Sequence, residues 1–412
     1  MGFYSRLRGE FSFIRGNILV IMTSWALMNF ASAIPQTYYS LFILALGGTP
    51  SIIGIMEFAS FLTLASVQFP GGYLADKHGR RRIIVVFTFA IAFANLFCVF
   101  APSWHFLLIG VMLQNIFLVY QPALQAITAD SIPTEKRGIG FSTMMFANNA
   151  ATILSPLIAG LLCVQYGLVS GMRMAYLLIV VLYLLASIIR IKLTETLKTQ
   201  SNRFHLSGAF REYVNAAKES IQVWKKLSRS MFFLFLTNAA SSFVFMMCMP
   251  YFVVYATNIL QVKEFTWAII MAFYSGSMIL SSLPSGKLVD KIGRKKPALI
   301  SWVLLAFFPP LFLLGGVYLL LVGFLCFGVS NALFAAAYLA LEADLVPKKL
   351  RGKEVGCSQF ITYTLMSIGG LLGGVFYQSL SPSLPFIFAF AVTFLCAAIT
   401  IVLVHEPKNK QE

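Results

Sequence analysis

The chain has 412 residues, of which 58% are hydrophobic and 11% are charged. In soluble domains roughly a quarter of all residues are charged. This composition therefore excludes a large soluble enzyme, which needs far more polar surface. The net charge of +16 would suit nucleic acid, but the basic residues lie in short segments between long apolar runs, so we expect no nucleic-acid partner.

Apolar runs of about twenty residues recur along the whole chain, and each can cross the roughly 30 Å hydrocarbon core of a bilayer. The sequence therefore predicts an all-α membrane protein with twelve transmembrane helices. We place these spans at residues 17–45, 50–74, 82–101, 104–129, 138–166, 171–192, 231–259, 264–289, 297–314, 317–342, 353–378 and 383–405.

The distribution of lysine and arginine predicts how the chain crosses the membrane. If both termini lie in the cytoplasm, the cytoplasmic segments hold 29 of the 31 basic residues, and only Arg173 and Lys263 lie outside. This asymmetry follows the positive-inside rule. We therefore expect a multi-pass protein of the cell (plasma) membrane, surrounded by lipid bilayer, with both termini cytoplasmic.

Two loops of the first half recur in the second half. The loop 72–82 matches the loop 286–296, and the segment 130–138 matches 344–352, in each case with an offset of 214 residues. A common offset in two separate loops predicts duplication of a six-helix unit, an arrangement that many transporter folds use. We expect bundles at 1–192 and 231–412. The shared positions are Gly72, Asp76, Gly79, Arg80, Asp130, Arg137, Gly286, Asp290, Gly293, Arg294, Asp344 and Arg351.

These loops resemble the signature of the major facilitator superfamily, whose pattern extends here over residues 15–405 and comes nearest to drug-efflux members. The resemblance implies two pseudo-symmetric bundles that rock to expose a solute to each side in turn. It also implies a cytoplasmic latch, in which Arg80 pairs with Asp130 and Arg294 pairs with Asp344. Asp76 would face the start of the eleventh span at 353–357, and Asp290 would face the start of the fifth at 138–141.

The glycines of the repeated loop have two predicted uses. Gly79 and Gly293 permit a tight turn between helices, because a left-handed backbone is favourable only for glycine. Gly72 and Gly286 lack side chains, so we expect them to let each helix approach a neighbouring span closely.

Residues 193–230 form the predicted cytoplasmic linker between the bundles. Within 207–229 the apolar residues share one helical face, opposite Arg211, Lys218 and Lys225. We expect an amphipathic helix that lies on the inner leaflet and places its cations near anionic head groups.

Polar residues inside the spans predict a neutral substrate cavity flanked by aromatic rings. Any one of them could instead serve helix packing. The candidates are Asn29, Gln36, Tyr39, Gln114, Asn115, Gln121, Asn148, Asn149, Asn238, Asn331, Tyr338, Gln359 and Tyr363.

The charges inside the spans are fewer still. We find no lysine or arginine at mid-membrane, so we expect no clamp for small polyanions. Glu57 is the one acid that lies well inside the limits of a span and away from the inner face, near the outer end of the second span. It is either a coupling residue, with protons as the coupling ion, or a solvated residue at the outer mouth.

Other chemistry finds little support. The six cysteines and four histidines match no metal motif or nucleophile–base pair, and no Walker lysine is present, so we expect no cofactor and no enzyme activity. Val111 stands where drug:proton antiporters carry an arginine. We predict a monomeric secondary transporter that exports amphipathic or neutral compounds. The alternatives are uptake or facilitated diffusion of a neutral polar metabolite such as a sugar, and a non-transport scaffold or lipid-handling protein.

Overall fold

The computed structural model describes residues 14–133, 137–196, 224, 227–347 and 350–406. Within these ranges the side chains of residues 68–78, 137–139, 141, 142 and 351–353 are not described. Twelve helical spans of the described chain are long and apolar enough to cross a membrane, which confirms the predicted number.

The first six spans form the first half. Its elements are α2 (Asn17–Gln36), α3 (Tyr39–Ala45), α4 (Pro50–His78), α5 (Arg80–Val99), α6 (Trp104–Phe117), η1 (Leu118–Tyr120), α7 (Gln121–Ser131), α8 (Arg137–Ala151), η3 (Thr152–Leu154), α9 (Ser155–Tyr166) and α10 (Leu168–Arg190).

The last six spans form the second half. Its elements are α12 (Arg229–Cys248), η4 (Met249–Tyr251), α13 (Phe252–Asn258), α14 (Glu264–Ile292), α15 (Lys295–Leu314), α16 (Val317–Leu345), α17 (Arg351–Val375), η5 (Phe376–Leu380) and α18 (Leu384–Leu403).

Several spans consist of two helices joined by a short irregular turn. Pro35, Pro122, Pro156 and Pro250 lie at or beside these breaks. Proline has no N–H to give to the preceding turn, and its ring crowds the carbonyl four residues earlier, so it interrupts a regular helix.

Glycines end several of the helices. Gly79 follows α4 with a φ of 85°, and Gly293 follows α14 with a φ of 89°, so both adopt the left-handed backbone that the sequence predicted. The prediction for Gly286 is wrong, because a Cβ atom added there would meet nothing within 4 Å. The side chains around Gly72 lie outside the described part of the chain.

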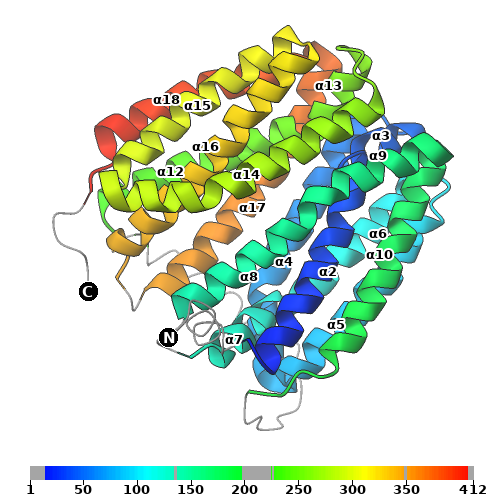
Figure 1. Cartoon of the computed structure of the whole chain (residues 1–412), viewed down its shortest axis with the longest axis vertical. Helices are drawn as coiled ribbons and strands as arrows, with labels where there is room; N and C mark the ends of the chain where they lie inside the picture. The colour runs from blue at the N-terminus through cyan, green and yellow to red at the C-terminus, as the bar shows by residue number, and fades with distance from the viewer. Residues whose placement is uncertain (1–13, 134–136, 197–223, 225–226, 348–349, 407–412) are drawn as a thin grey trace, which may run out of the picture.

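The two halves lie side by side with their helices running in roughly the same direction (Figure 1). α4 packs along α17, and α9 packs along α14, which gives the largest contacts between the halves. We call the end that holds the α4–α5 and α14–α15 turns the basic end, and the other the opposite end. The positive-inside rule predicts that the basic end is cytoplasmic.

The buried core differs between the two ends. At the opposite end one apolar cluster includes Phe42 and Tyr176 of the first half together with Tyr251 and Trp267 of the second. Toward the basic end the described residues form separate clusters, one around Ile127 in the first half and two in the second. Among the described side chains, the halves therefore share a core at the opposite end and not at the basic end.

Of the predicted amphipathic segment 207–229, the structure describes Trp224 and residues 227–229. The Trp224 ring packs against Phe235 of α12 at 4.5 Å between centroids. The remainder of the segment lies outside the described residues, so its membrane contact stays a prediction.

Candidate functional site

Two adjoining hollows lie where the halves meet. The interface hollow has a volume of about 260 Å³, and both halves line it, with Ser40 and Thr152 on one side and Trp267 and Tyr274 on the other. The second hollow, about 230 Å³, is lined by the first half together with Met246 of α12. Each hollow is slightly smaller than the roughly 300–1,000 Å³ that is usual for a small-molecule site, and the two adjoin.

Gln36, Tyr39 and Glu57 line both hollows and therefore join them. Gln36 donates from Nε2 to the sulfur of Met249 in the other half at 3.8 Å. The Tyr39 hydroxyl is buried and has no hydrogen-bond partner. Unsatisfied polar groups at a hollow are available to a bound molecule, because a buried donor without a partner is costly.

Glu57 is the acidic residue at this junction. It lies in the second turn of α4 and is 8% exposed, so it is not a solvated residue at the outer mouth. Gly370 of α17 faces it so closely that an added Cβ would lie 2.7 Å from the Cβ of Glu57. No other Asp or Glu lines either hollow. A buried carboxylate beside a solute cavity is a candidate for carrying a proton.

Hydrogen bonds join the halves at the opposite end. The Tyr38 hydroxyl donates to the Glu264 carbonyl at 2.6 Å, and the Tyr251 hydroxyl donates to the Pro50 carbonyl at 3.1 Å. The Ser51 N–H donates to Oε1 of Gln378 at 2.8 Å. Together with the shared apolar core, these contacts close the opposite end.

The repeated loops carry an ion pair in each half at the basic end. Arg80 Nη1 lies 2.6 Å from Asp130 Oδ2, and Arg294 Nε lies 3.0 Å from Asp344 Oδ2. These are the two pairings that the family resemblance implies. Each pair joins residues of one half, so it braces the end of that half.

The remaining motif positions are only partly described. Gly72 and Asp76 lie in α4, Arg137 begins α8 and Arg351 begins α17, but their side chains lie outside the described residues. Asp290 is exposed on α14.

Two glutamates that the sequence reasoning missed lie beside the repeated loops. Glu195 accepts the Arg81 N–H at 2.9 Å, at the start of α5. Glu406 accepts the N–H groups of Arg294, at 2.7 Å, and Lys295, at the start of α15. Carboxylates satisfy the free N–H groups and the positive dipole end of a helix. Glu195 follows the last span of the first half, and Glu406 follows the last span of the second half. This repeated position is visible in the sequence and could have identified both residues.

Arg190 ends α10 at the basic end, but it is not the solvated charge that a basic residue at a helix end suggests. The side chain is fully buried inside the first half. It donates to Ser24 Oγ at 3.1 Å and to Thr88 Oγ1 at 2.7 Å, and its guanidinium lies 5.1 Å from the Tyr120 ring centroid. It lines neither hollow, and no lysine or arginine is among the described residues that line them.

The predicted cavity residues separate into three sets. Gln36, Tyr39, Gln114 and Asn115 line the two hollows. Asn238, Asn331 and Tyr338 line a different cavity, inside the second half. The others line none of these spaces, and they are Asn29, Gln121, Asn148, Asn149, Gln359 and Tyr363.

The described residues contain no group of three His, Cys, Asp or Glu side chains that could hold a metal ion. All six cysteines are free, and five of them are buried.

Curated proteins similar to this chain are drug-resistance transporters. The multi-drug resistance efflux pump PmrA of Streptococcus pneumoniae serotype 4 is 23% identical over 352 residues, covering 80% of this chain and 79% of the pump. The quinolone resistance protein NorA of Staphylococcus aureus is 30% identical over 142 residues, covering 34% of this chain and 36% of NorA.

Solved structures share the fold at low identity. A point mutant of the nucleoside transporter NupG superposes with a TM-score of 0.74 at 14% identity, covering 94% of this chain and all of NupG. A bacterial homologue of the human lysosomal transporter Spinster superposes with a TM-score of 0.75 at 14% identity, covering 94% of this chain and 96% of its own.

The family model described as Major Facilitator Superfamily matches residues 16–268 and 231–412. Its two matches together extend from the first span to the end of the chain. With twelve spans and transporter neighbours, the protein is a multi-pass membrane transporter. The chain belongs to the major facilitator superfamily.

Proposed function

We propose that this transporter exports neutral or amphipathic organic compounds, and that Glu57 carries a coupling proton. The observation that carries the proposal is the junction of the two hollows, where one buried carboxylate faces a space lined by both halves. A carboxylate in this position can contact the solute, and it lies at the interface between the halves, which changes when the halves rock.

The lining favours a neutral solute with an apolar body. Trp267, Tyr274, Phe324 and Phe327 supply ring surface, and Gln36 supplies hydrogen bonds. Specificity in such pockets comes from a few polar groups set among apolar ones. Since the walls contain no lysine or arginine, nothing there would compensate the charge of a polyanion.

The closed opposite end supports alternating access. A solute enters from the basic end in this state, because the halves share their core and hydrogen bonds at the other end. Release on the other side requires those contacts to break and the basic end to close. The ion pairs Arg80–Asp130 and Arg294–Asp344 stiffen the ends of the helices that must then meet.

Export accords with the similarity to PmrA and NorA, whose names describe drug efflux and drug resistance. A second candidate is uptake of a neutral polar metabolite. It is favoured by the second hollow, whose walls include Ser32, Ser60, Gln114 and Asn115.

The decisive experiment is a toxicity panel in an efflux-deficient bacterial host. Cells that express the chain should tolerate several-fold more of neutral aromatic amphiphiles than cells that express Glu57→Gln at the same level. Direction is then measured in everted vesicles with a fluorescent dye. Unchanged tolerance across the panel, together with faster uptake of a labelled sugar or nucleoside by intact cells, would select the uptake function.

A further inference from the structure

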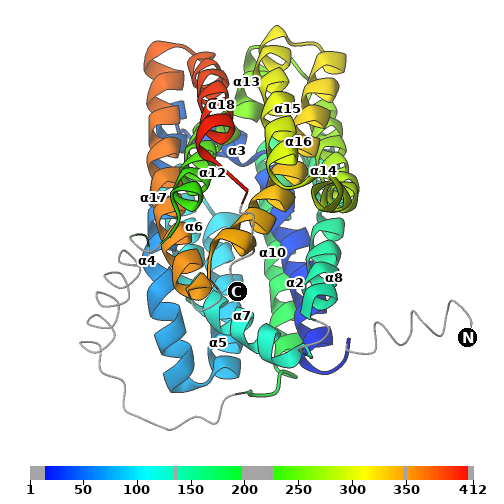
Figure 2. The ribbon, with the colours of Figure 1, turned by 90° about the vertical axis from the view of Figure 1, so that its left-hand side faces the viewer.

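A cavity larger than either hollow lies inside the second half. Its volume is about 520 Å³, twice that of the interface hollow. All its lining residues belong to the second half and lie on α12, α13, α14, α15, α16 and α18. In Figure 2, α12, α17 and α18 stand on one side of this half, and α14, α15 and α16 stand on the other.

The internal repeat shows how this region of the second half differs from the matching region of the first. In the first half the guanidinium of Arg190 fills the corresponding space, in contact with Ser24, Thr88 and Tyr120. With the offset of 214, Arg190 corresponds to Val404. The long cation is therefore absent from the second half.

The partners of that cation have also changed in the second half. Asn238, Trp302 and Phe334 occupy the positions of Ser24, Thr88 and Tyr120, and all three line the cavity. The Trp302 and Phe334 rings pack at 4.7 Å between centroids, and Trp302 Nε1 donates to Thr400 Oγ1 at 3.0 Å. Both rings are thus fixed in place beside an open space.

Rings make up much of the cavity wall. Phe308 stacks on Phe327 at 4.6 Å, and Phe252 packs edge-on against Phe308 at 5.3 Å. Phe245, Phe252 and Phe327 line both this cavity and the interface hollow, so they form the wall between the two. A rigid wall of packed rings suits a flat aromatic molecule, because offset-stacked and edge-to-face contacts need fixed geometry.

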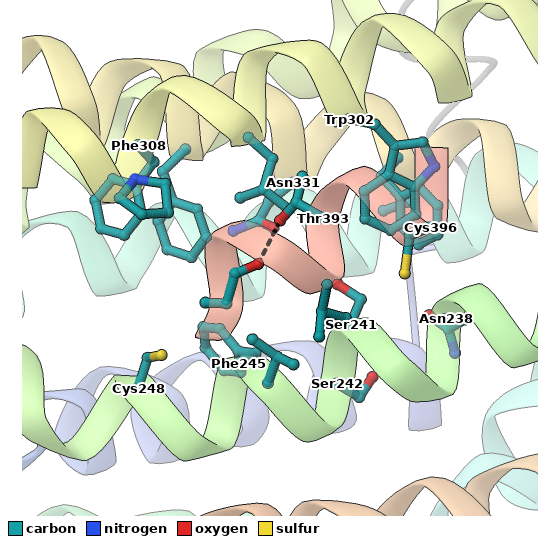
Figure 3. A pocket seen from close by; sticks show the side chains of 18 of the residues that line it. Asn238, Ser241, Ser242, Phe245, Cys248, Trp302, Phe308, Asn331, Thr393 and Cys396 are labelled. Carbon is teal, nitrogen blue, oxygen red and sulfur yellow. Dashed lines mark hydrogen bonds between the residues drawn. The ribbon is translucent and has the colours of Figure 1, made fainter. Parts of the chain in front are cut away.

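The polar groups of the cavity are few and uncharged. Figure 3 shows Asn238, Ser241 and Ser242 along α12, with Asn331 and Thr393 on the facing helices. Thr393 already donates to the Ala389 carbonyl at 2.9 Å. With no Asp, Glu, Lys, Arg or His among the lining residues, a charged ligand would have no compensating partner.

We propose that the second half alone contains a binding site for a neutral aromatic amphiphile, separate from the interface hollow. The rings hold its flat body, and the amide and hydroxyl groups of α12 receive its polar end. Because one rigid half supplies every contact, the site keeps its shape when the halves rock. This proposal goes beyond the export function, since binding here requires neither transport nor Glu57.

The test measures binding by the purified chain in detergent, with N-phenyl-1-naphthylamine as a neutral fluorescent probe. Ala389→Phe places a ring into the cavity and should weaken the probe's Kd by about tenfold or more. Ser241→Leu fills the facing wall and should weaken it in the same direction. Ala391→Phe is the matched control, because Ala391 lies on the same helix, is exposed, and lines no cavity.

A check of folding and a second variant keep the binding test independent of folding, and the binding assay itself requires no transport. Each variant must elute as a monodisperse peak, and Ser241→Leu serves if Ala389→Phe does not fold. Equal affinity in all variants would overturn the proposal, as would an equal loss in Ala391→Phe. A co-purifying phospholipid that is displaced from Ala389→Phe and Ser241→Leu would replace the proposed ligand with an acyl chain and also overturn it.

Discussion

Gly54→Ala should force the closed opposite end of the molecule apart. Gly54 lies where α4 crosses α17, and a Cβ added there would lie 2.7 Å from the Gly370 carbonyl oxygen. It would also lie 3.1 Å from Gly374 Cα and 3.1 Å from the Tyr251 hydroxyl oxygen. Two of these three atoms belong to the backbone, so no rotamer change can relieve them.

The size of the effect follows from these contacts. Non-bonded atoms are comfortable at about 3.5–4.0 Å, so α4 and α17 must separate by several tenths of an ångström at Gly54. Overpacking of this kind costs about 1–3 kcal/mol. The cost falls on the state in which the two helices touch, so the ratio of the two states should shift by roughly 5- to 150-fold toward opening at the opposite end.

The assay is cysteine accessibility in membrane vesicles of known orientation. Ser40 is 3% exposed and lines the interface hollow, so Ser40→Cys reports whether water reaches that hollow. A membrane-impermeant maleimide added at the opposite end should label Ser40→Cys faster in the presence of Gly54→Ala. Gly276→Ala is the control, because a Cβ at Gly276 would meet nothing within 4 Å.

Labelling from the opposite end at the parental rate, in a Gly54→Ala chain that is stable in the membrane, would refute the reasoning. It would mean that the α4–α17 contact yields locally and does not set the conformational equilibrium. Equal acceleration by Gly276→Ala would instead show that any added methyl group disturbs the protein.

Three further predictions concern coupling, the basic end and selectivity. Glu57→Gln should abolish pH-driven transport in proteoliposomes and leave counterflow exchange intact, whereas unchanged pH-driven transport would remove Glu57 from coupling. Arg80→Ala should lower transport far more than the amount of protein in the membrane, because the lost pair with Asp130 biases the two states, and Arg294→Ala should have a weaker effect; a larger effect of Arg294→Ala would reverse this order. Saturable uptake of phosphate, nitrate or a dicarboxylate should be absent, and its detection would contradict the neutral character of the cavity walls.

Much of the fold could be predicted because each membrane helix appears in the sequence as a long run of apolar residues. The bilayer fixes a minimum span, and the loops 72–82 and 286–296 show the duplication directly. The ion pairs of Arg80 and Arg294 followed from the family resemblance. The turns at Gly79 and Gly293 followed from a rule about single residues, namely that glycine tolerates a positive φ.

The site was harder to predict because a membrane helix is apolar on the sides that face lipid and on the sides that pack against other helices. The sequence therefore gives little sign of which face lines a cavity. Gln114 and Asn115 line a hollow, whereas Gln121, one turn and a half further along, does not. Arg190 sits at the last residue of its helix, where a basic residue usually marks topology. Its burial is stabilised by Ser24, Thr88 and the Tyr120 ring, which come from spans distant in the sequence.

The closure of the opposite end carries no motif at all. The hydroxyls of Tyr38 and Tyr251 donate hydrogen bonds to backbone carbonyls. Every residue has a backbone carbonyl, so the identity of the acceptor residue gives no sign of the contact in the sequence. Gly286 shows the reverse case. Its place in a repeated motif suggested a close approach, but nothing lies against it.

The apolar core that the halves share at the opposite end makes the transport cycle sensitive to temperature. Opening that end brings water to surfaces such as Phe42, Tyr251 and Trp267, whereas opening the basic end leaves the shared core intact. Hydration of apolar surface raises the heat capacity, so the free energy between the two states must vary with temperature along a curve. Hydrophobic contacts weaken on cooling. Cold therefore weakens the contacts that hold the opposite end closed, so the balance between the two states carries a temperature-dependent contribution from this core.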